Sequence, residues 1–160
     1  MYLSNISVRT FFIASIITLL LGCEKDSDTP APKTEAQLIG SGLAWKFSKA
    51  ISGGVDVSSL VEVCMKDNLI TMNDASPTKT GNVNEGAIKC NASDPQQVAF
   101  TWTYNGSTKL LTIISTGGVR ILPGGSNVFT LVSITETQMV LSQNIVFMGS
   151  TQLAQATFVH

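Results

Sequence analysis

The sequence is poor in charge and contains a single histidine. Lys and Arg number 10 and Asp and Glu number 11, so the formal net charge is −1 and no basic cluster stands out. Proteins that bind nucleic acid neutralise phosphates with a basic face, so this composition argues against nucleic-acid partners. The histidine is the last residue, His160, and no Ser-His or Cys-His pair for nucleophilic catalysis stands out. We therefore expect neither enzymatic activity nor nucleic-acid binding.

Motifs for metal ions and cofactors are missing too. A zinc site needs about four ligands at close spacing, and three scattered cysteines with one terminal histidine do not supply them. The Gly117-Gly118 and Gly124-Gly125 pairs do not lie between a strand and a helix, as a phosphate-binding loop would. The sequence therefore predicts no metal site and no cofactor.

The apolar run near the start is too short to cross a membrane. Residues 11–21 read FFIASIITLLL, about half of the ~20 residues that a spanning helix needs. A polar start with one cation, Arg9, followed by a short apolar run is typical of a secretory signal peptide. We interpret residues 1–22 as that signal peptide.

The end of this run resembles the lipobox of bacterial lipoproteins, since Leu20, Leu21 and Gly22 precede Cys23. The resemblance implies cleavage before Cys23, a diacylglycerol on its sulfur, and acylation of the new amine with a fatty acid such as palmitate. Two or three acyl chains hold a protein firmly on a membrane. An ordinary signal peptide that contains a cysteine is the alternative interpretation.

The lipobox resemblance implies that residues 23–36 begin with a lipidated cysteine. The rest of this segment predicts a flexible tether, because charged, small polar and proline residues dominate there. Within it, Lys25-Asp26-Ser27-Asp28 is similar to the export signals of surface lipoproteins of the Bacteroidota. A generic solvated spacer is the other interpretation of the same charges. We expect an outer-membrane lipoprotein that faces either the periplasm or the cell surface.

Two cysteines remain once Cys23 is assigned to the lipid. Secretion places Cys64 and Cys90 in an oxidising compartment, where an even pair tends to form a disulfide. Such a bond would close a loop of about 25 residues and contribute ~3 kcal/mol. Free buried thiols and half of a metal site are the competing interpretations.

Hydrophobic residues alternate with polar ones through most of residues 37–160, which predicts one all-β domain. The clearest strand is 98–104, and Asn105-Gly106 then suits a tight hairpin turn before a returning strand at 109–116. We also expect strands at 44–51, 68–73, 85–89, 117–122, 128–135, 138–143 and 152–159, with short helices at 34–39 and 57–62. Residues 75–84 lack a strand pattern and predict a flexible loop. About eight strands with short connections favour an antiparallel sandwich or an up-and-down barrel.

A series of short motifs runs through the domain in the order Leu38-Ile39-Gly40, Trp45-Lys46-Phe47, Val57-Ser58-Ser59-Leu60, Cys64, Asp67-Asn68, the Glu85 to Cys90 run, Asp94-Pro95-Gln96 and Trp102. In this order the motifs resemble those of the lipocalin-like lipoproteins of the Bacteroidota. The resemblance implies an eight-stranded antiparallel up-and-down barrel over residues 37–160, with short helical pieces and a Cys64–Cys90 bond.

Aromatic residues on the expected inner face leave two functions open. They can line a cavity for a small hydrophobic ligand, or they can fill the interior, because small eight-stranded barrels are often packed solid. The first alternative predicts a lipocalin-like binding protein. The second predicts a non-catalytic structural or accessory lipoprotein that acts through protein contacts. The candidate ligand-binding residues are Trp45, Phe47, Phe100, Trp102 and Tyr104.

Overall fold

A computed structural model describes residues 30–75, 77–118, 120–122, 126–147 and 149–160. The predicted signal peptide, the lipidation site Cys23 and most of the tether lie outside these residues. The unit Pro32–His160 forms its own compact body, and it contains the whole closed sheet and the disulfide. Among the described helices, none has the length and apolar character needed to cross a bilayer.

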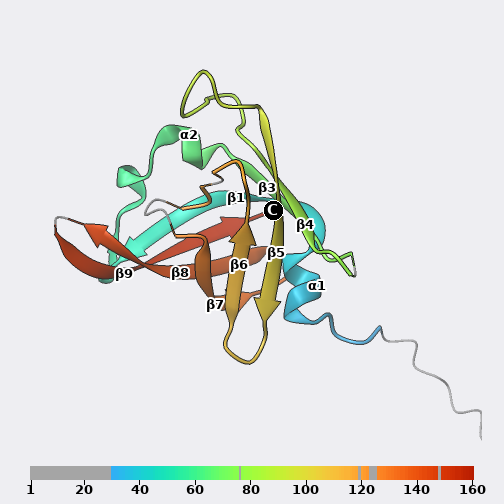
Figure 1. Cartoon of the computed structure of the whole chain (residues 1–160). Coiled ribbons are helices and arrows are strands. Elements are labelled where there is room, and N and C mark those ends of the chain that lie inside the picture. Colours follow the sequence, from blue (N-terminus) through green and yellow to red (C-terminus); the bar gives the residue numbers. More distant parts are fainter. Residues whose placement is uncertain (1–29, 76, 119, 123–125, 148) are drawn as a thin grey trace, which may run out of the picture. The chain divides into compact units, whose positions relative to one another are not determined.

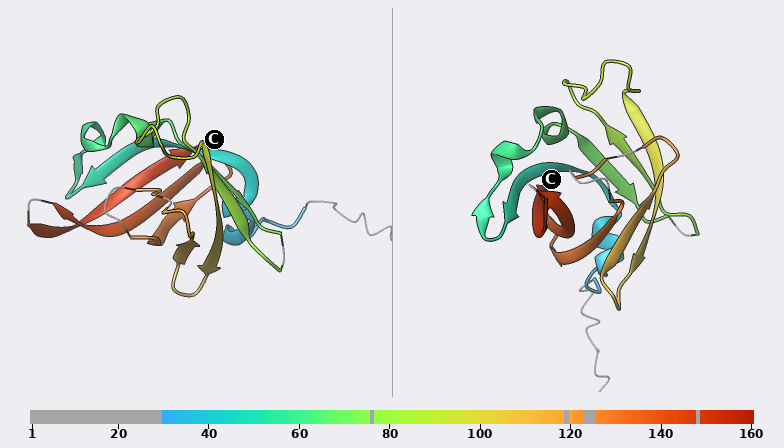
Figure 2. Two further views of the ribbon diagram at one scale, coloured as in Figure 1. Left: turned by 45° about the horizontal axis from the view of Figure 1, so that its top comes forward. Right: turned by 60° about the vertical axis from the view of Figure 1, so that its left-hand side comes forward.

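Eight antiparallel strands close into an up-and-down barrel, as the sequence predicts (Figures 1 and 2). Each strand pairs with the next along the chain, and the last one closes on the first through the Lys46↔Val159 to Ser52↔Ala154 register. A two-residue strand, β2 (Val55–Asp56), adds a short ribbon to β1. The barrel strands are β1 (Ser41–Ser52), β3 (Leu69–Asn73), β4 (Thr80–Asn84), β5 (Gln97–Asn105), β6 (Leu110–Ile114), β7 (Val128–Ile134), β8 (Gln138–Phe147) and β9 (Ser150–Val159).

The first predicted helix is present, and the second differs from the prediction. Helix α1 (Glu35–Ile39) begins with a capping box, in which the Thr34 hydroxyl accepts from the Gln37 backbone N–H. In place of a helix at 57–62, the chain forms a single 3₁₀ turn, η1 (Ser58–Leu60). Helix α2 (Val63–Lys66) then follows. Both short pieces precede β3, so they lie in one connection between β1 and β3.

The alternation of side chains places large apolar residues inside the barrel. Trp45, Trp102, Phe129 and Phe158 are almost fully buried there. A smaller cluster of Ala50, Val61, Cys64 and Met65 lies beside this main core. The main core consists of Ile39, Trp45, Ile70, Met72, Val83, Phe100, Trp102, Leu111, Ile113, Ile121, Leu122, Phe129, Leu131, Met139, Leu141, Ala156 and Phe158.

The strand predicted at 85–89 is wrong, because this segment is a turn and loop. Gly86 has a φ of +63°, outside the extended range of regular strand residues, and none of residues 85–89 pairs in the sheet. The Asp67 carboxylate accepts from the backbone N–H groups of Ala87 at 2.8 Å and Ile88 at 3.0 Å. A side chain about twenty residues earlier therefore satisfies donors that a strand partner would otherwise take.

The loop predicted at 75–84 is wrong over its second half, because β4 begins at Thr80. The sequence TGNVN has low β-propensity, yet it pairs with both β3 and β5. Gly81 lies directly under the ring of Phe100: a Cβ built there would lie 2.2 Å from the ring carbon Cζ. The glycine that weakens the strand pattern is therefore what lets the aromatic ring approach the backbone.

The weak strand predicted at 117–122 is also wrong in its described residues. Gly118 has a φ of +70°, and none of these residues pairs in the sheet. Ile121 and Leu122 are instead 5 % exposed and pack into the main core. Their burial explains the apolar pattern that favoured a strand.

Candidate functional site

One end of the barrel is closed, and we call it the base. Helix α1 covers it: Ile39 is fully buried, and its carbonyl accepts from the indole N–H of Trp45 at 3.2 Å. The ring of His160 stacks on Trp45 with ring centroids 3.6 Å apart. The carboxylate of Glu35, in α1, accepts from Tyr104 and from the Lys109 ammonium, at 2.7 Å from the latter. These contacts tie α1 to the β5–β6 hairpin and fill the base.

The opposite end, which we call the open end, holds an apolar cavity of about 320 Å³. This volume lies at the lower end of the range of about 300–1,000 Å³ that is typical of ligand pockets. Its floor is formed by β1, β8 and β9, and its cover by residues 55–61, which we call the roof segment. The lining residues are Ala50, Ser52, Val55, Val57, Leu60, Val61, Leu122, Gln143, Ile145, Gln152, Ala154, Gln155 and Ala156.

Small side chains on neighbouring strands create this cavity. Ala50 pairs with Ala156 and Ser52 with Ala154 across the β1–β9 seam. The inward position next after Ala156 on β9 is Phe158, which is 1 % exposed. Along the same face, side chains thus shrink from phenylalanine to alanine toward the open end. The space between floor and roof is the volume that larger side chains at these positions would occupy.

The roof segment is held by hydrogen bonds to β1. The Val57 N–H donates to the Ala50 carbonyl, and the Ala50 N–H donates to the Ser58 hydroxyl, both at 2.9 Å. Asp56 accepts from the Ser58 backbone N–H at 2.9 Å. The side chain and the backbone of Ser58 both hold the pKa of Asp56 below its ordinary value. These bonds place Val57, Leu60 and Val61 over the alanine floor.

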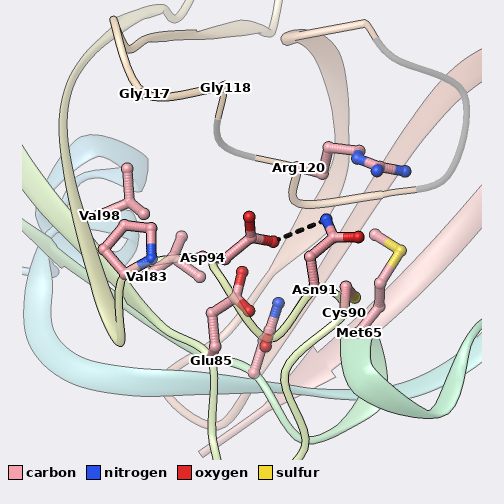
Figure 3. Close-up of a pocket in the computed structure, with 12 residues that line it drawn as sticks. Met65, Val83, Glu85, Cys90, Asn91, Asp94, Val98, Gly117, Gly118 and Arg120 are labelled. Atoms are coloured by element: carbon pink, nitrogen blue, oxygen red, sulfur yellow. Dashed lines mark hydrogen bonds between the residues drawn. The ribbon is translucent and has the colours of Figure 1, made fainter.

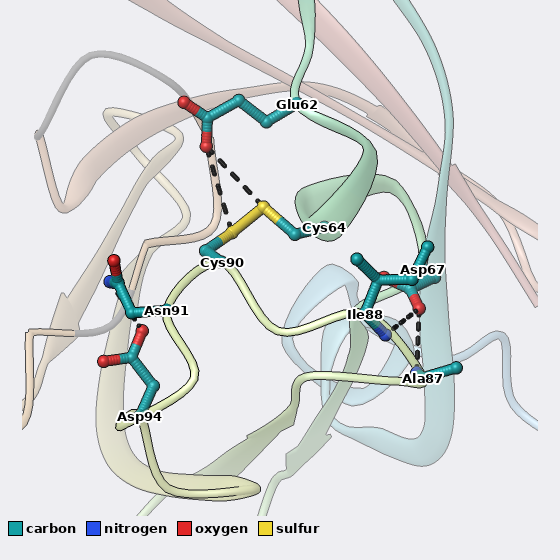
Figure 4. Close-up of a disulfide and its surroundings, with 8 residues drawn as sticks. All are labelled: Glu62, Cys64, Asp67, Ala87, Ile88, Cys90, Asn91 and Asp94. Atoms are coloured by element: carbon teal, nitrogen blue, oxygen red, sulfur yellow. Dashed lines mark hydrogen bonds between the residues drawn. A yellow bond between two sulfur atoms is a disulfide. The ribbon is translucent and has the colours of Figure 1, made fainter.

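A disulfide between Cys64 and Cys90 anchors the connection that carries the roof segment (Figure 4). It joins α2 to the loop between β4 and β5, with a Cα–Cα distance of 5.1 Å. This confirms the pairing expected from the cysteine count. The Glu62 carboxylate contacts both sulfurs, at 3.6 Å and 3.9 Å, and could complete a three-ligand metal group. A disulfide carries no thiolate, so this group offers no sulfur ligand while the bond is intact.

A second cavity at the open end is smaller, about 150 Å³, and polar (Figure 3). Asn91 donates to the Asp94 carboxylate at 2.9 Å, and the Arg120 guanidinium points away from Glu85 and Asp94. One oxygen each of Glu85 and Asn68 is buried without a hydrogen-bond partner in the described residues. Such groups are ordinarily satisfied by water. Charged and amide side chains thus give this cavity a polar lining, unlike that of the apolar cavity.

The apolar cavity has one polar corner, formed by Ser52, Gln143 and Gln152. Ser52 and Gln143 are 9 % and 6 % exposed. The Ser52 hydroxyl donates to the Gln152 side-chain carbonyl at 3.1 Å. None of the cavity's lining residues in the described part of the chain is ionisable. The cavity therefore offers hydrogen bonds but no charge.

The five candidate ligand-binding residues all lie outside the apolar cavity. Trp45, Phe100 and Trp102 belong to the main core, and Phe47 packs between the two clusters. Tyr104 is half-buried and donates to Glu35; burial first, and then this hydrogen bond, raises its pKa. Their positions match the other interpretation of the sequence, in which aromatic residues fill the barrel.

Sequence reasoning missed the residues that line the cavity. Large aromatic side chains attract attention, whereas the cavity comes from alanines and glutamines on β1, β8 and β9. A signal was present: inward positions on β9 change from Phe158 to Ala156 and Ala154, which leaves a stretch of the inner face short of volume. This change in side-chain size indicates a cavity only when the pairing of β1 with β9, and its register, are known.

The sequence matches no family model, and no curated protein is detectably similar to it. The structure, in contrast, is similar to that of Japanin from Rhipicephalus appendiculatus, solved bound to cholesterol. The TM-score is 0.51 at 13 % sequence identity, over 80 % of this chain and 78 % of that one. The fold is a lipocalin-like barrel. At this identity the similarity establishes the fold alone.

Proposed function

We propose that this protein is a lipocalin-like binding protein that holds a small apolar molecule in the cavity at the open end. The observation that carries the proposal is the 320 Å³ space between the alanine floor and the roof segment. Burying apolar surface there stabilises a ligand by roughly 25 cal/mol per Å² of area removed from water. The structure of Japanin with cholesterol supports the idea that a barrel of this architecture accommodates an apolar ligand.

The alternative is an accessory lipoprotein with a filled barrel. The dense packing around Trp45, Trp102 and Phe129 favours it, because the deeper half of the interior leaves no room for a ligand. The two proposals differ at the open end only. A ligand-binding protein uses the space over Ala154, whereas an accessory protein has no need of it.

Filling the cavity tests the proposal. The chain from residue 24 onward, which lacks the lipidation site and is exported to the periplasm, is titrated with a neutral solvatochromic dye. Ala154→Trp should weaken dye binding at least about tenfold, because the indole occupies the volume that the ligand needs. Leu153→Trp is the matched control: Leu153 is 55 % exposed on the outer face of the same strand, so binding should be unchanged. Equal binding by all three chains would overturn the proposal.

We further propose that a lipid on Cys23 anchors the protein to the outer membrane. The Leu-Leu-Gly-Cys sequence at residues 20–23 supports this part of the proposal. A Cys23→Ala variant should appear in the soluble fraction of the cell envelope, while the wild type pellets with membranes. A variant that stays with the membranes would contradict the anchor.

A further inference from the structure

Three charged residues that flank the lining residues of β1 and the roof segment, Lys49, Asp56 and Glu62, have partners of their own. Lys49 lies on the outer face of β1, next to Ala50, and its ammonium pairs with Asp56 at 3.7 Å. Both side chains are about half exposed. Glu62, which follows the roof segment, contacts the disulfide. No cation therefore faces the cavity from β1 or from the roof segment.

This absence of charge selects among apolar ligands. A carboxylate that enters an apolar site must lose water, and without a cation nothing replaces that hydration. Desolvating a hydroxyl or a carbonyl group costs much less free energy, and one hydrogen bond to the protein compensates for that cost. The cavity therefore penalises the anionic headgroup of a fatty acid and tolerates a neutral polar end.

The polar corner gives such a neutral end a place to bind. Ser52 and Gln143 both pair with Ala154, one across β1–β9 and the other across β8–β9. Gln152 is the next inward residue of β9 toward the open end. The side-chain oxygen of Gln152 accepts from Ser52, and a glutamine amide also carries two donor hydrogens. The corner can both donate to and accept from one ligand group.

We propose that the ligand is an uncharged amphiphile, with an apolar body under the roof segment and one hydroxyl or carbonyl group at the polar corner. This inference rests on the proposed function and narrows it to a ligand class. Long-chain alcohols and neutral ring alcohols belong to the class, whereas ionised fatty acids do not.

A matched pair of probes tests the class. 1-Decanol and decanoate have the same chain length and differ in the charge of the headgroup. Isothermal titration calorimetry at pH 8, on the chain from residue 24 onward, should show decanol binding at least about tenfold more tightly than decanoate.

A charge introduced at the polar corner should reverse the preference. Gln152 is exposed at the edge of the cavity, so Gln152→Lys can be accommodated without burying the ammonium. We expect decanoate to bind at least about tenfold more tightly to this variant than to the wild type. Leu153→Lys adds the same charge on the outer face of β9 and should leave both affinities unchanged.

The outcomes separate this inference from the proposed function. If neither probe binds the wild type, the cavity is not a ligand site and both proposals fail. If decanoate binds the wild type as tightly as decanol, the uncharged class is wrong while the binding function stands. If Gln152→Lys gains no affinity for decanoate, or Leu153→Lys gains as much, the headgroup does not lie at the polar corner, and the inference is overturned.

Discussion

The base and the open end of this barrel are built from the same strands with side chains of different size. β1 contributes Trp45 near the base and Ala50 near the open end; β9 contributes Phe158 and then Ala156. Both ends follow the same inward–outward alternation. The difference teaches that the position of small residues along the strands, not the number of strands, decides where an eight-stranded barrel has room.

The two ends also differ in what holds them. The base is joined by side-chain contacts, from Trp45 to the Ile39 carbonyl and from Tyr104 and Lys109 to Glu35. At the open end, Val57 and Ser58 join the roof segment to β1 through hydrogen bonds, and the disulfide anchors the connection that follows. Side-chain contacts therefore hold the base, and a covalent constraint supports the open end.

Removing the largest side chain at the base should have the largest effect on stability. Trp45→Ala deletes a fully buried indole and should lower the free energy of unfolding by about 3–5 kcal/mol. At the open end, Ala154→Leu should change it by less than about 1.5 kcal/mol, because the cavity accepts the added volume. Urea unfolding measures both. Similar decreases in the free energy of unfolding for the two variants would contradict the view that the base is filled and the open end has room.

Removing the disulfide should act on the open end. Cys64→Ala combined with Cys90→Ala should lower the free energy of unfolding by about 3 kcal/mol, from the entropy of the opened loop. Dye affinity should fall too, since Cys64 packs against Val61 and Ala50 beneath the roof segment. Wild type treated with reductant should reproduce both changes. Unaltered dye binding by the reduced protein would show that the disulfide does not maintain the shape of the cavity.

Gly81→Ala tests the fit of β4 against the core. The added Cβ would lie 2.2 Å from the Phe100 ring and 2.8 Å from the Thr71 carbonyl oxygen. We therefore expect the substitution to lower the free energy of unfolding by about 1–3 kcal/mol, measured by urea unfolding. Combining it with Phe100→Leu should recover part of that loss in a double-mutant cycle. If the two substitutions lower the free energy of unfolding additively, then Gly81 and the Phe100 ring do not interact, and the close contact does not explain the glycine.

The smallest expected effect is a pH dependence at the base. The hydrogen bond from Lys109, and next the one from Tyr104, lower the pKa of Glu35. A lowered folded-state pKa stabilises the protein above the unfolded pKa of about 4.3, and the contribution disappears as the pH falls through the folded value. Glu35 and Lys109 are both more than one-third exposed, so we expect at most about 0.5 kcal/mol.

Glu35→Gln removes this contribution. The free energy of unfolding of the variant should lie below that of the wild type at pH 7, and the two should converge below pH ~4. Urea titrations at several pH values measure the difference. A gap that widens toward acid would contradict the sign of the pKa shift.

Local patterns in the sequence predicted much of the fold. Alternation identified β5 and β6, and the cysteine count identified the Cys64–Cys90 bond. The errors arose where a distant residue decides the local structure. Asp67 holds the backbone of Ala87 and Ile88 in a turn, and the sequence around them carries no trace of this.

The candidate site was less accessible to sequence reasoning than the fold. Trp45, Phe100 and Trp102 stand out as large aromatic residues, yet they fill the main core. The cavity depends on Ala50 and Ala156 facing each other across the closing seam. Alternation predicts which residues of a strand point inward. It cannot tell which small residues meet, because that depends on the register between the first and last strands.

Native mass spectrometry of the periplasmically exported chain tests the central claim most directly. We expect the wild type to carry one small neutral molecule per chain, and Ala154→Trp, which fills the cavity, to carry none. Leu153→Trp should retain the bound molecule. A wild type that carries no bound molecule, or an Ala154→Trp variant that carries the same molecule as the wild type, would contradict the claim that the open end of this barrel is a ligand site.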